Sequence, residues 1–125
     1  MGVILAPADD DVTSPDVSWS CTWFGHFRRA LAAAEGFDLD SMAGFGGDAP
    51  WNTVETTLAP LLNHPDDSGD LTAAECAQVI PRLTEIISSW RDEPSEHWQA
   101  YAERGHDLIE VLQVCVRQGV SLMFC

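Results

Sequence analysis

Apolar residues recur every three or four positions over two long stretches of the chain, and this spacing predicts two amphipathic helices. The first stretch begins at Thr72, which forms a T-x-x-E capping box with Glu75. Pro81 lies inside this helix and should bend it near the carbonyl of Ala77, because proline has no N–H for that acceptor. The buried side of this helix is predicted to hold Cys76, Val79, Ile80, Leu83, Ile86, Ile87 and Trp90.

The second long stretch predicts a helix from about Glu96 to Gln118, ended by Gly119. A third helix is predicted from about Thr22 to Glu35, followed by Gly36, a residue type that commonly ends helices. A short helix is predicted from Leu58 to about Asn63. The chain is therefore expected to be mainly α, as a compact four-helix domain.

Both ends of the chain carry short apolar runs. Val3–Ala6 is stopped by Pro7, and Val120–Cys125 follows the last predicted helix. Backbone N–H and C=O groups that leave water need partners, so we predict that these two runs pair as a short two-stranded sheet. With 125 residues and 46% apolar content, residues 1–125 should form a single domain, with 1–17 as its N-terminal segment.

Residues 64–75 have the outline of an EF-hand calcium loop, which has oxygen ligands at positions 1, 3, 5, 7, 9 and 12 and glycine at position 6. Setting Gly69 at position 6 places Leu71 at position 8, which is usually apolar. Apolar helices flank the loop, so the unit 58–90 resembles an EF-hand helix–loop–helix. The resemblance implies a weak calcium site made of Asp66, Ser68, Asp70 through its backbone carbonyl, Thr72 and Glu75.

The loop departs from the EF-hand pattern at its first ligand. His64 stands at position 1, where its nitrogen suits a hard cation such as calcium poorly. Pro65 follows directly and stiffens the start of the loop. EF-hands usually work in pairs, and no second loop is visible, so calcium affinity should be in the millimolar range. Three interpretations stay open: a capped turn kept for its shape, which we favour, a weak metal site, and a calcium sensor.

The net charge is strongly negative, with 20 acidic residues against 6 basic ones and a formal charge of −14. All the basic residues are arginines, and only Arg28 and Arg29 are adjacent. Nucleic acids and anionic membranes are bound by clustered Lys and Arg, so we expect neither as a partner. A basic protein or a divalent cation would be attracted instead.

The cysteines and the absence of targeting signals predict a cytoplasmic protein. Cys21, Cys76, Cys115 and Cys125 form no C-x-x-C pair and are expected to be free thiols. The start of the chain has no basic segment before its apolar run and is not predicted to be a signal peptide. No apolar stretch approaches the roughly 20 residues that a membrane-spanning helix needs.

For the other residues that could bind phosphate, bind a metal or act as a nucleophile, a structural role is the better interpretation. Gly44-Phe45-Gly46-Gly47 lacks the lysine of a phosphate-binding loop and is predicted to be a tight turn. Cys21 has no histidine adjacent to it in sequence, so it is a weak candidate nucleophile. The histidines are too widely spaced for a zinc signature; they are His26, His64, His97 and His106. We therefore predict no catalytic residue and no enzyme.

Three segments, together with the predicted helical C-terminus, carry a further resemblance, to a group of small acidic actinobacterial proteins of unassigned function. They read DVSWSCTWFGHFRRALAAAEGF, GFGG and LAPLLNHPDDSGDLTAAEC. The resemblance spans most of the chain. It implies one compact domain and carries no known activity.

The sequence thus favours a non-enzymatic binding or regulatory protein built on the EF-hand-like unit, with a protein partner of unknown identity. The alternatives are a weak calcium-binding protein that uses loop 64–75, and an acidic inhibitor or immunity protein that neutralises a basic target. The pattern leaves open whether Trp19, Trp23 and Trp51 belong to the core or to an exposed interface.

Overall fold

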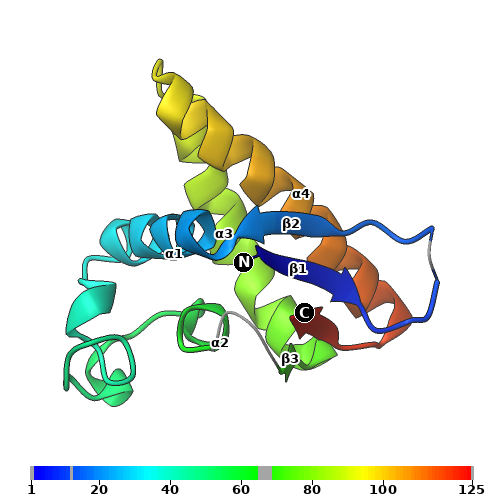
Figure 1. The fold of residues 1–125 in the computed structure, drawn as a ribbon, viewed down its shortest axis with the longest axis horizontal. Helices are drawn as coiled ribbons and strands as arrows, with labels where there is room; N and C mark the ends of the chain where they lie inside the picture. The colour runs from blue at the N-terminus through cyan, green and yellow to red at the C-terminus, as the bar shows by residue number, and fades with distance from the viewer. Residues whose placement is uncertain (1, 12, 65–68, 125) are drawn as a thin grey trace.

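The computed structural model describes residues 2–11, 13–64 and 69–124, which form helices covered on one side by a small sheet (Figure 1). The helices are α1 (Cys21–Ala34), α2 (Ala59–Leu62), α3 (Ala73–Arg91) and α4 (Glu96–Gln118). The strands are β1 (Gly2–Pro7), β2 (Val17–Ser20), β3 (Asp70–Leu71) and β4 (Leu122–Phe124). Two 3₁₀ turns, Leu39–Ser41 and Trp51–Thr53, lie in the segment between α1 and α2. The mainly α prediction is confirmed.

The predicted capping box at the start of α3 is present. The backbone N–H of Glu75 donates to Oγ1 of Thr72 at 3.1 Å, and the N–H of Thr72 donates to Oε1 of Glu75 at 3.0 Å. Helix α3 then continues without interruption through Pro81 to Arg91. Local sequence therefore fixes where this helix begins, and the buried residues on its inner side hold it against α4.

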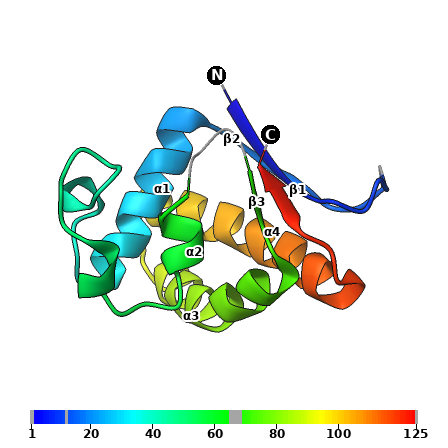
Figure 2. The same cartoon turned by 90° about the horizontal axis from the view of Figure 1, so that it is seen from below.

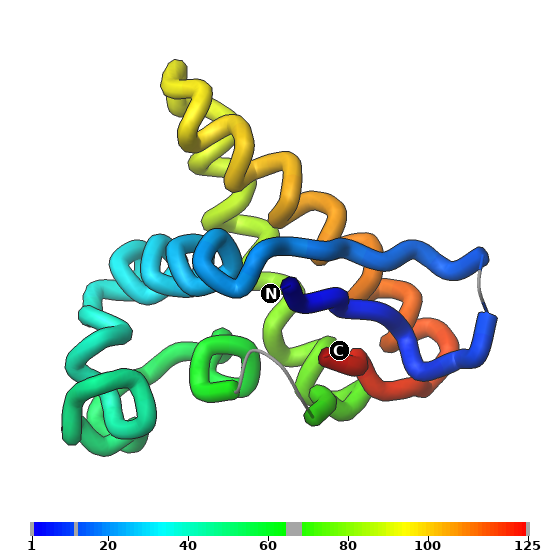
Figure 3. Tube along the Cα trace, viewed as in Figure 1, coloured from blue at the N-terminus to red at the C-terminus, as the bar shows by residue number. Residues whose placement is uncertain are grey.

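The sheet has four antiparallel strands in the order β2-β1-β4-β3, so the predicted two-stranded sheet was too small. The N- and C-terminal strands lie side by side at its centre (Figure 3). Leu5 of β1 is paired with Phe124 of β4. Strand β2 pairs with β1 on one side, and β3 pairs with β4 on the other. Strands β2 and β3 are too short for the alternation of apolar and polar residues to be recognised in the sequence, so the sequence predicted only two strands.

The EF-hand-like unit is not confirmed. Helix α2 is a single turn, Ala59–Leu62, so the helix that should enter the loop is much shorter than α3, which leaves it. Strand β3, at the end of the loop, pairs with β4 of the same sheet. The described residues of this segment are therefore a single helical turn, α2, and a short strand, β3, that leads into the capped helix α3.

Aromatic side chains fill the space between α1, α3, α4 and the sheet. Trp19 on β2 is buried and stacks on Phe24 and Phe27, with ring centroids 5.0 and 5.2 Å apart. Trp23 is partly buried on the edge of this cluster, against Tyr101. Trp51 packs separately, edge-on against Phe37 and Phe45. These three tryptophans therefore belong to the core or pack against it. Among the described residues, no helix is both long and apolar enough to cross a membrane.

Candidate functional site

In the described part of loop 64–75, groups at the predicted ligand positions bond to one another. Nε2 of His64 lies 3.1 Å from the carbonyl oxygen of Asp70. These are positions 1 and 7 of the EF-hand pattern, which would otherwise both face a cation. The His64 ring also stacks on Phe124, with centroids 3.8 Å apart. The histidine thus contacts both β3, through Asp70, and β4, through Phe124.

The remaining predicted ligands are partly outside the described residues. Asp66 and Ser68 fall in the segment that is not described. Thr72 and Glu75 are engaged in the capping box of α3. Calcium binding in the predicted geometry would therefore have to replace both the histidine–carbonyl contact and the capping bond of Glu75. No group of three or more potential metal-binding side chains occurs among the described residues.

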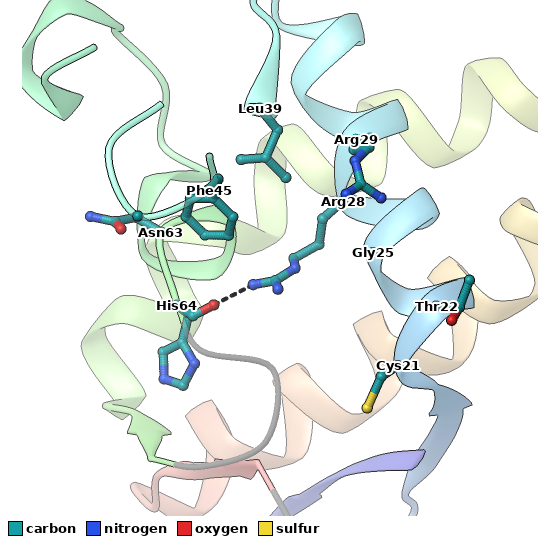
Figure 4. A pocket seen from close by; sticks show the side chains of 10 residues that line it. Cys21, Thr22, Gly25, Arg28, Arg29, Leu39, Phe45, Asn63 and His64 are labelled. Carbon is teal, nitrogen blue, oxygen red and sulfur yellow. Dashed lines mark hydrogen bonds between the residues drawn. The ribbon is translucent and has the colours of Figure 1, made fainter. Parts of the chain in front are cut away.

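Beside His64 lies a cavity of about 720 Å³ between the outer face of α1 and the chain from 39 to 64 (Figure 4). Helix α1 begins where Oγ of Ser20 accepts a hydrogen bond from the N–H of Trp23, and this places the start of the helix at one side of the cavity. The described lining residues are Cys21, Thr22, Gly25, Arg28, Arg29, Leu39, Gly44, Phe45, Asn63 and His64.

Arg28 is the central polar group of the cavity, although only 5% of the residue is exposed. Its Nη1 donates to the carbonyl oxygens of His64 and, at 3.4 Å, of Leu61, which lie 36 and 33 residues further along the chain. Its Cζ lies 4.6 Å from the centre of the Phe24 ring and 5.5 Å from that of Phe45. Figure 4 shows the side chain reaching from α1 toward the main chain of His64. Carbonyls and ring faces together hold this guanidinium in place.

Arg29 supplies a second positive charge at the same wall. Its Nε lies 2.9 Å from Oδ1 of Asp40, and both side chains are about half exposed. An exposed ion pair of this kind contributes little to stability but orients the arginine. The cavity therefore has two guanidinium groups in its wall. That of Arg28 is buried and fixed, and that of Arg29 is about half exposed and oriented by its ion pair with Asp40.

The glycine segment folds as the tight turn predicted from sequence. Gly44 and Gly46 have φ of 90° and 103°, values that favour glycine. A Cβ on Gly47 would lie 2.1 Å from the carbonyl oxygen of Ser41, so only glycine fits that close approach. The turn forms part of the cavity wall through Gly44 and Phe45.

Sequence reasoning missed this cavity, although it had noted most of its polar residues one by one. The sequence presents Arg28 and Arg29 only as a pair too small to indicate binding of nucleic acid or an anionic membrane, and Cys21 as a weak nucleophile with no adjacent histidine. The fold brings Cys21 and His64 to the same cavity, and Figure 4 shows them on different sides of it. The sequence signal for this cavity is an arginine, Arg28, within the apolar stripe of a helix, since an arginine is rarely fully buried unless its guanidinium is paired.

The other two described cysteines lie away from this cavity, between α3 and α4. Cys76 and Cys115 are both fully buried. Hydrogen bonding to the Cys115 thiol, together with burial, raises the pKa of Cys76 far above its ordinary value. The same bond lowers the pKa of Cys115. As predicted, these thiols are free and form part of the core.

Comparisons of this chain with protein-family models, with curated proteins and with solved structures found no match. The resemblance drawn from the sequence segments therefore stays a prediction.

Proposed function

We propose that this chain is a non-enzymatic binding protein, and that the cavity beside Arg28 and His64 holds a small molecule with an anionic group. The observation that carries the proposal is the buried guanidinium of Arg28, fixed in the wall of a cavity of about 720 Å³. Small-molecule sites commonly have volumes of about 300–1,000 Å³, with apolar walls and a few convergent polar groups.

The charge of the cavity supports an anionic ligand. The chain as a whole carries −14, yet two of its six basic residues, Arg28 and Arg29, line this cavity. No carboxylate is present among the described lining residues. Since Arg28 is already held by two carbonyls and a ring face, it would lose little side-chain freedom when a carboxylate or phosphate binds.

The walls support a ligand larger than a bare anion. Leu39 and Phe45 supply apolar surface, while Asn63 and Thr22 offer side-chain hydrogen bonds. A volume of about 720 Å³ exceeds what a phosphate ion alone would fill. The ligand we propose therefore has an anionic head that faces Arg28 and an apolar body that lies against Phe45.

The orientation of His64 supports binding over catalysis. A thiol nucleophile is commonly activated by an adjacent base. Nε2 of His64 is directed to the carbonyl of Asp70, and the ring is stacked on Phe124. Cys21 lies on another side of the cavity from this imidazole (Figure 4).

The test is titration of the isotope-labelled protein with benzoate and with inorganic phosphate, followed by nuclear magnetic resonance. We expect saturable shifts for the amides of Gly25, Asn63 and His64, with benzoate bound more tightly than phosphate. Thr22→Trp should fill the mouth of the cavity and abolish these shifts while Arg28 stays in place. Thr84→Trp, at an exposed position on α3, is the matched control and should bind like the original protein.

Arg28→Met gives a second measurement. Methionine is flexible, apolar and similar in volume to arginine, so it removes the charge and keeps most of the packing while the two hydrogen bonds that Arg28 donates to the carbonyls of Leu61 and His64 are lost. This variant should fold and lose its preference for benzoate over the uncharged benzyl alcohol. Shifts that persist in Thr22→Trp, or the absence of saturable binding by either anion, would refute the proposed site.

A further inference from the structure

A second surface, independent of the cavity, is the outer face of the sheet. The helices pack against the inner face only, and Figure 2 shows no described element on the other side. Inward residues of β1 and β4, such as Val3, Leu5 and Phe124, are buried. Outward residues alternate with them, as the period of a strand requires.

The outer face carries an exposed apolar patch, which we define as Ile4, Ala6 and Met123. Ala6 and Met123 are directly paired across β1 and β4, and Ile4 is the next outward residue of β1. Ile4 is 45% exposed and Met123 is 43% exposed. The only other large apolar residue of comparable exposure in the described chain is Val116 on α4, at 39%. Flexible methionine side chains are frequent at surfaces that bind other proteins.

Acidic residues lie on β3 beside this patch and on the connection that follows β1. Asp70 on β3 is directly opposite Met123 in the sheet. The connection from β1 to β2 carries Asp10, Asp11 and Asp16, all exposed, and extends beyond the helices (Figure 1). The described residues of the four strands include no arginine, although Arg104 of α4 reaches the carbonyl of Ser18 at the edge of β2. The surface thus has an apolar centre and a mainly negative rim, the arrangement of many protein interfaces.

We propose that the outer face of the sheet, centred on Ile4, Ala6 and Met123, binds a basic protein partner. Charge complementarity identifies the occupant: apolar residues would cover the patch, and lysines or arginines would face the carboxylates of Asp70, Asp10, Asp11 and Asp16. A second copy of the same chain does not fit. Each copy carries −14, and pairing these faces would bring the two acidic rims together.

The test uses two synthetic peptides, one of alternating lysine and leucine and one of alternating lysine and serine, titrated into the labelled protein at low salt. The lysine–leucine peptide should bind saturably and shift the amides of Ile4, Ala6, Asp70 and Met123. Added salt should weaken this binding, because the rim charges are exposed. The lysine–serine peptide should bind at least about tenfold more weakly, because it cannot cover the patch.

Matched variants distinguish binding through the apolar patch from non-specific attraction to the net charge of the whole protein. Ile4→Thr with Met123→Gln keeps exposed side chains of similar size and should weaken the lysine–leucine peptide at least about tenfold. Val116→Thr changes an equally exposed apolar residue outside the sheet and should have no effect. Asp70→Asn should weaken binding a few-fold at low salt and not at high salt.

Three results would overturn the proposal. They are equal binding of the two peptides, shifts spread over the acidic surface without concentration on the sheet, and unchanged binding by the Ile4 and Met123 variant. Self-association of the protein at low salt, measured by sedimentation and abolished by the same variant, would show that a second copy is the occupant and would also count against it.

Discussion

Gly105 on α4 packs directly against Ile87 on α3: a Cβ built on the glycine would lie 2.1 Å from Cδ1 of Ile87. Both residues face the largest helix–helix contact of the molecule, and Ile87 is buried. Glycine within a helix costs about 1 kcal/mol relative to alanine. The close approach of α3 and α4 at this position accounts for its presence.

We expect Gly105→Ala to destabilise the protein by about 1 kcal/mol, measured by urea unfolding. Overpacking costs about 1–3 kcal/mol, and the gain in helix propensity offsets about 1 kcal/mol of that. In an Ile87→Ala background the clash disappears, so the same substitution should then be stabilising. A glycine-to-alanine effect of the same sign in both backgrounds would contradict this contact.

Glu75 distinguishes the capped turn from a calcium site. Glu75→Gln should change the free energy of unfolding by no more than about 0.5 kcal/mol, because glutamine also completes a capping box. Glu75→Ala should cost about 1 kcal/mol. Calorimetry should detect no calcium binding below about 1 mM. Submillimolar binding that Glu75→Gln abolishes would instead establish the predicted site at Asp66, Ser68, Asp70, Thr72 and Glu75.

The single tyrosine of the chain, Tyr101, provides a pH-dependent signal. Burial raises its pKa above the ordinary value of 10.0. A raised pKa means that the folded state holds the proton more tightly, so this contribution to stability is complete below pH 10 and is lost as the pH rises through the folded-state pKa. Phenolate absorbance should therefore appear above pH 10 in the native protein and near pH 10 in urea.

Tyr101→Phe is the control for this titration. The free energy of unfolding of this variant should fall less at alkaline pH than that of the original protein, while the ring packing against Trp23 and His97 is kept. Native-state ionisation at or below pH 10 would contradict the effect of burial.

Trp19 has a buried indole N–H with no hydrogen-bond partner among the described residues. An unsatisfied buried donor costs about 1–3 kcal/mol. Trp19→Phe removes that donor along with some apolar area, so we expect a loss of no more than about 1 kcal/mol in urea unfolding. Trp90→Phe is the matched comparison, because Trp90 is equally buried at 6% exposed and should lose more. Equal losses at the two positions would indicate that the Trp19 nitrogen has a partner.

The sequence by itself determined the features that depend on neighbouring residues. Thr72 and Glu75 are three positions apart, so the start of α3 could be predicted from their side chains and the periodic apolar residues that follow. Gly119, at φ 65°, ends α4 as predicted. The pairing of the two ends was inferred because short apolar runs need partners for their backbone groups, and β1 and β4 do pair.

Only the tertiary structure decided the features that join distant residues. Strand β3 has two residues and exists because β4 lies beside it. The contact between His64 and the carbonyl of Asp70 forms where Phe124, from the far end of the chain, packs on the imidazole. Arg28 became the centre of a cavity through carbonyls 33 and 36 residues away. Such contacts produce no periodic pattern of apolar residues in a sequence. Their free energy depends on how whole helices and strands pack against one another.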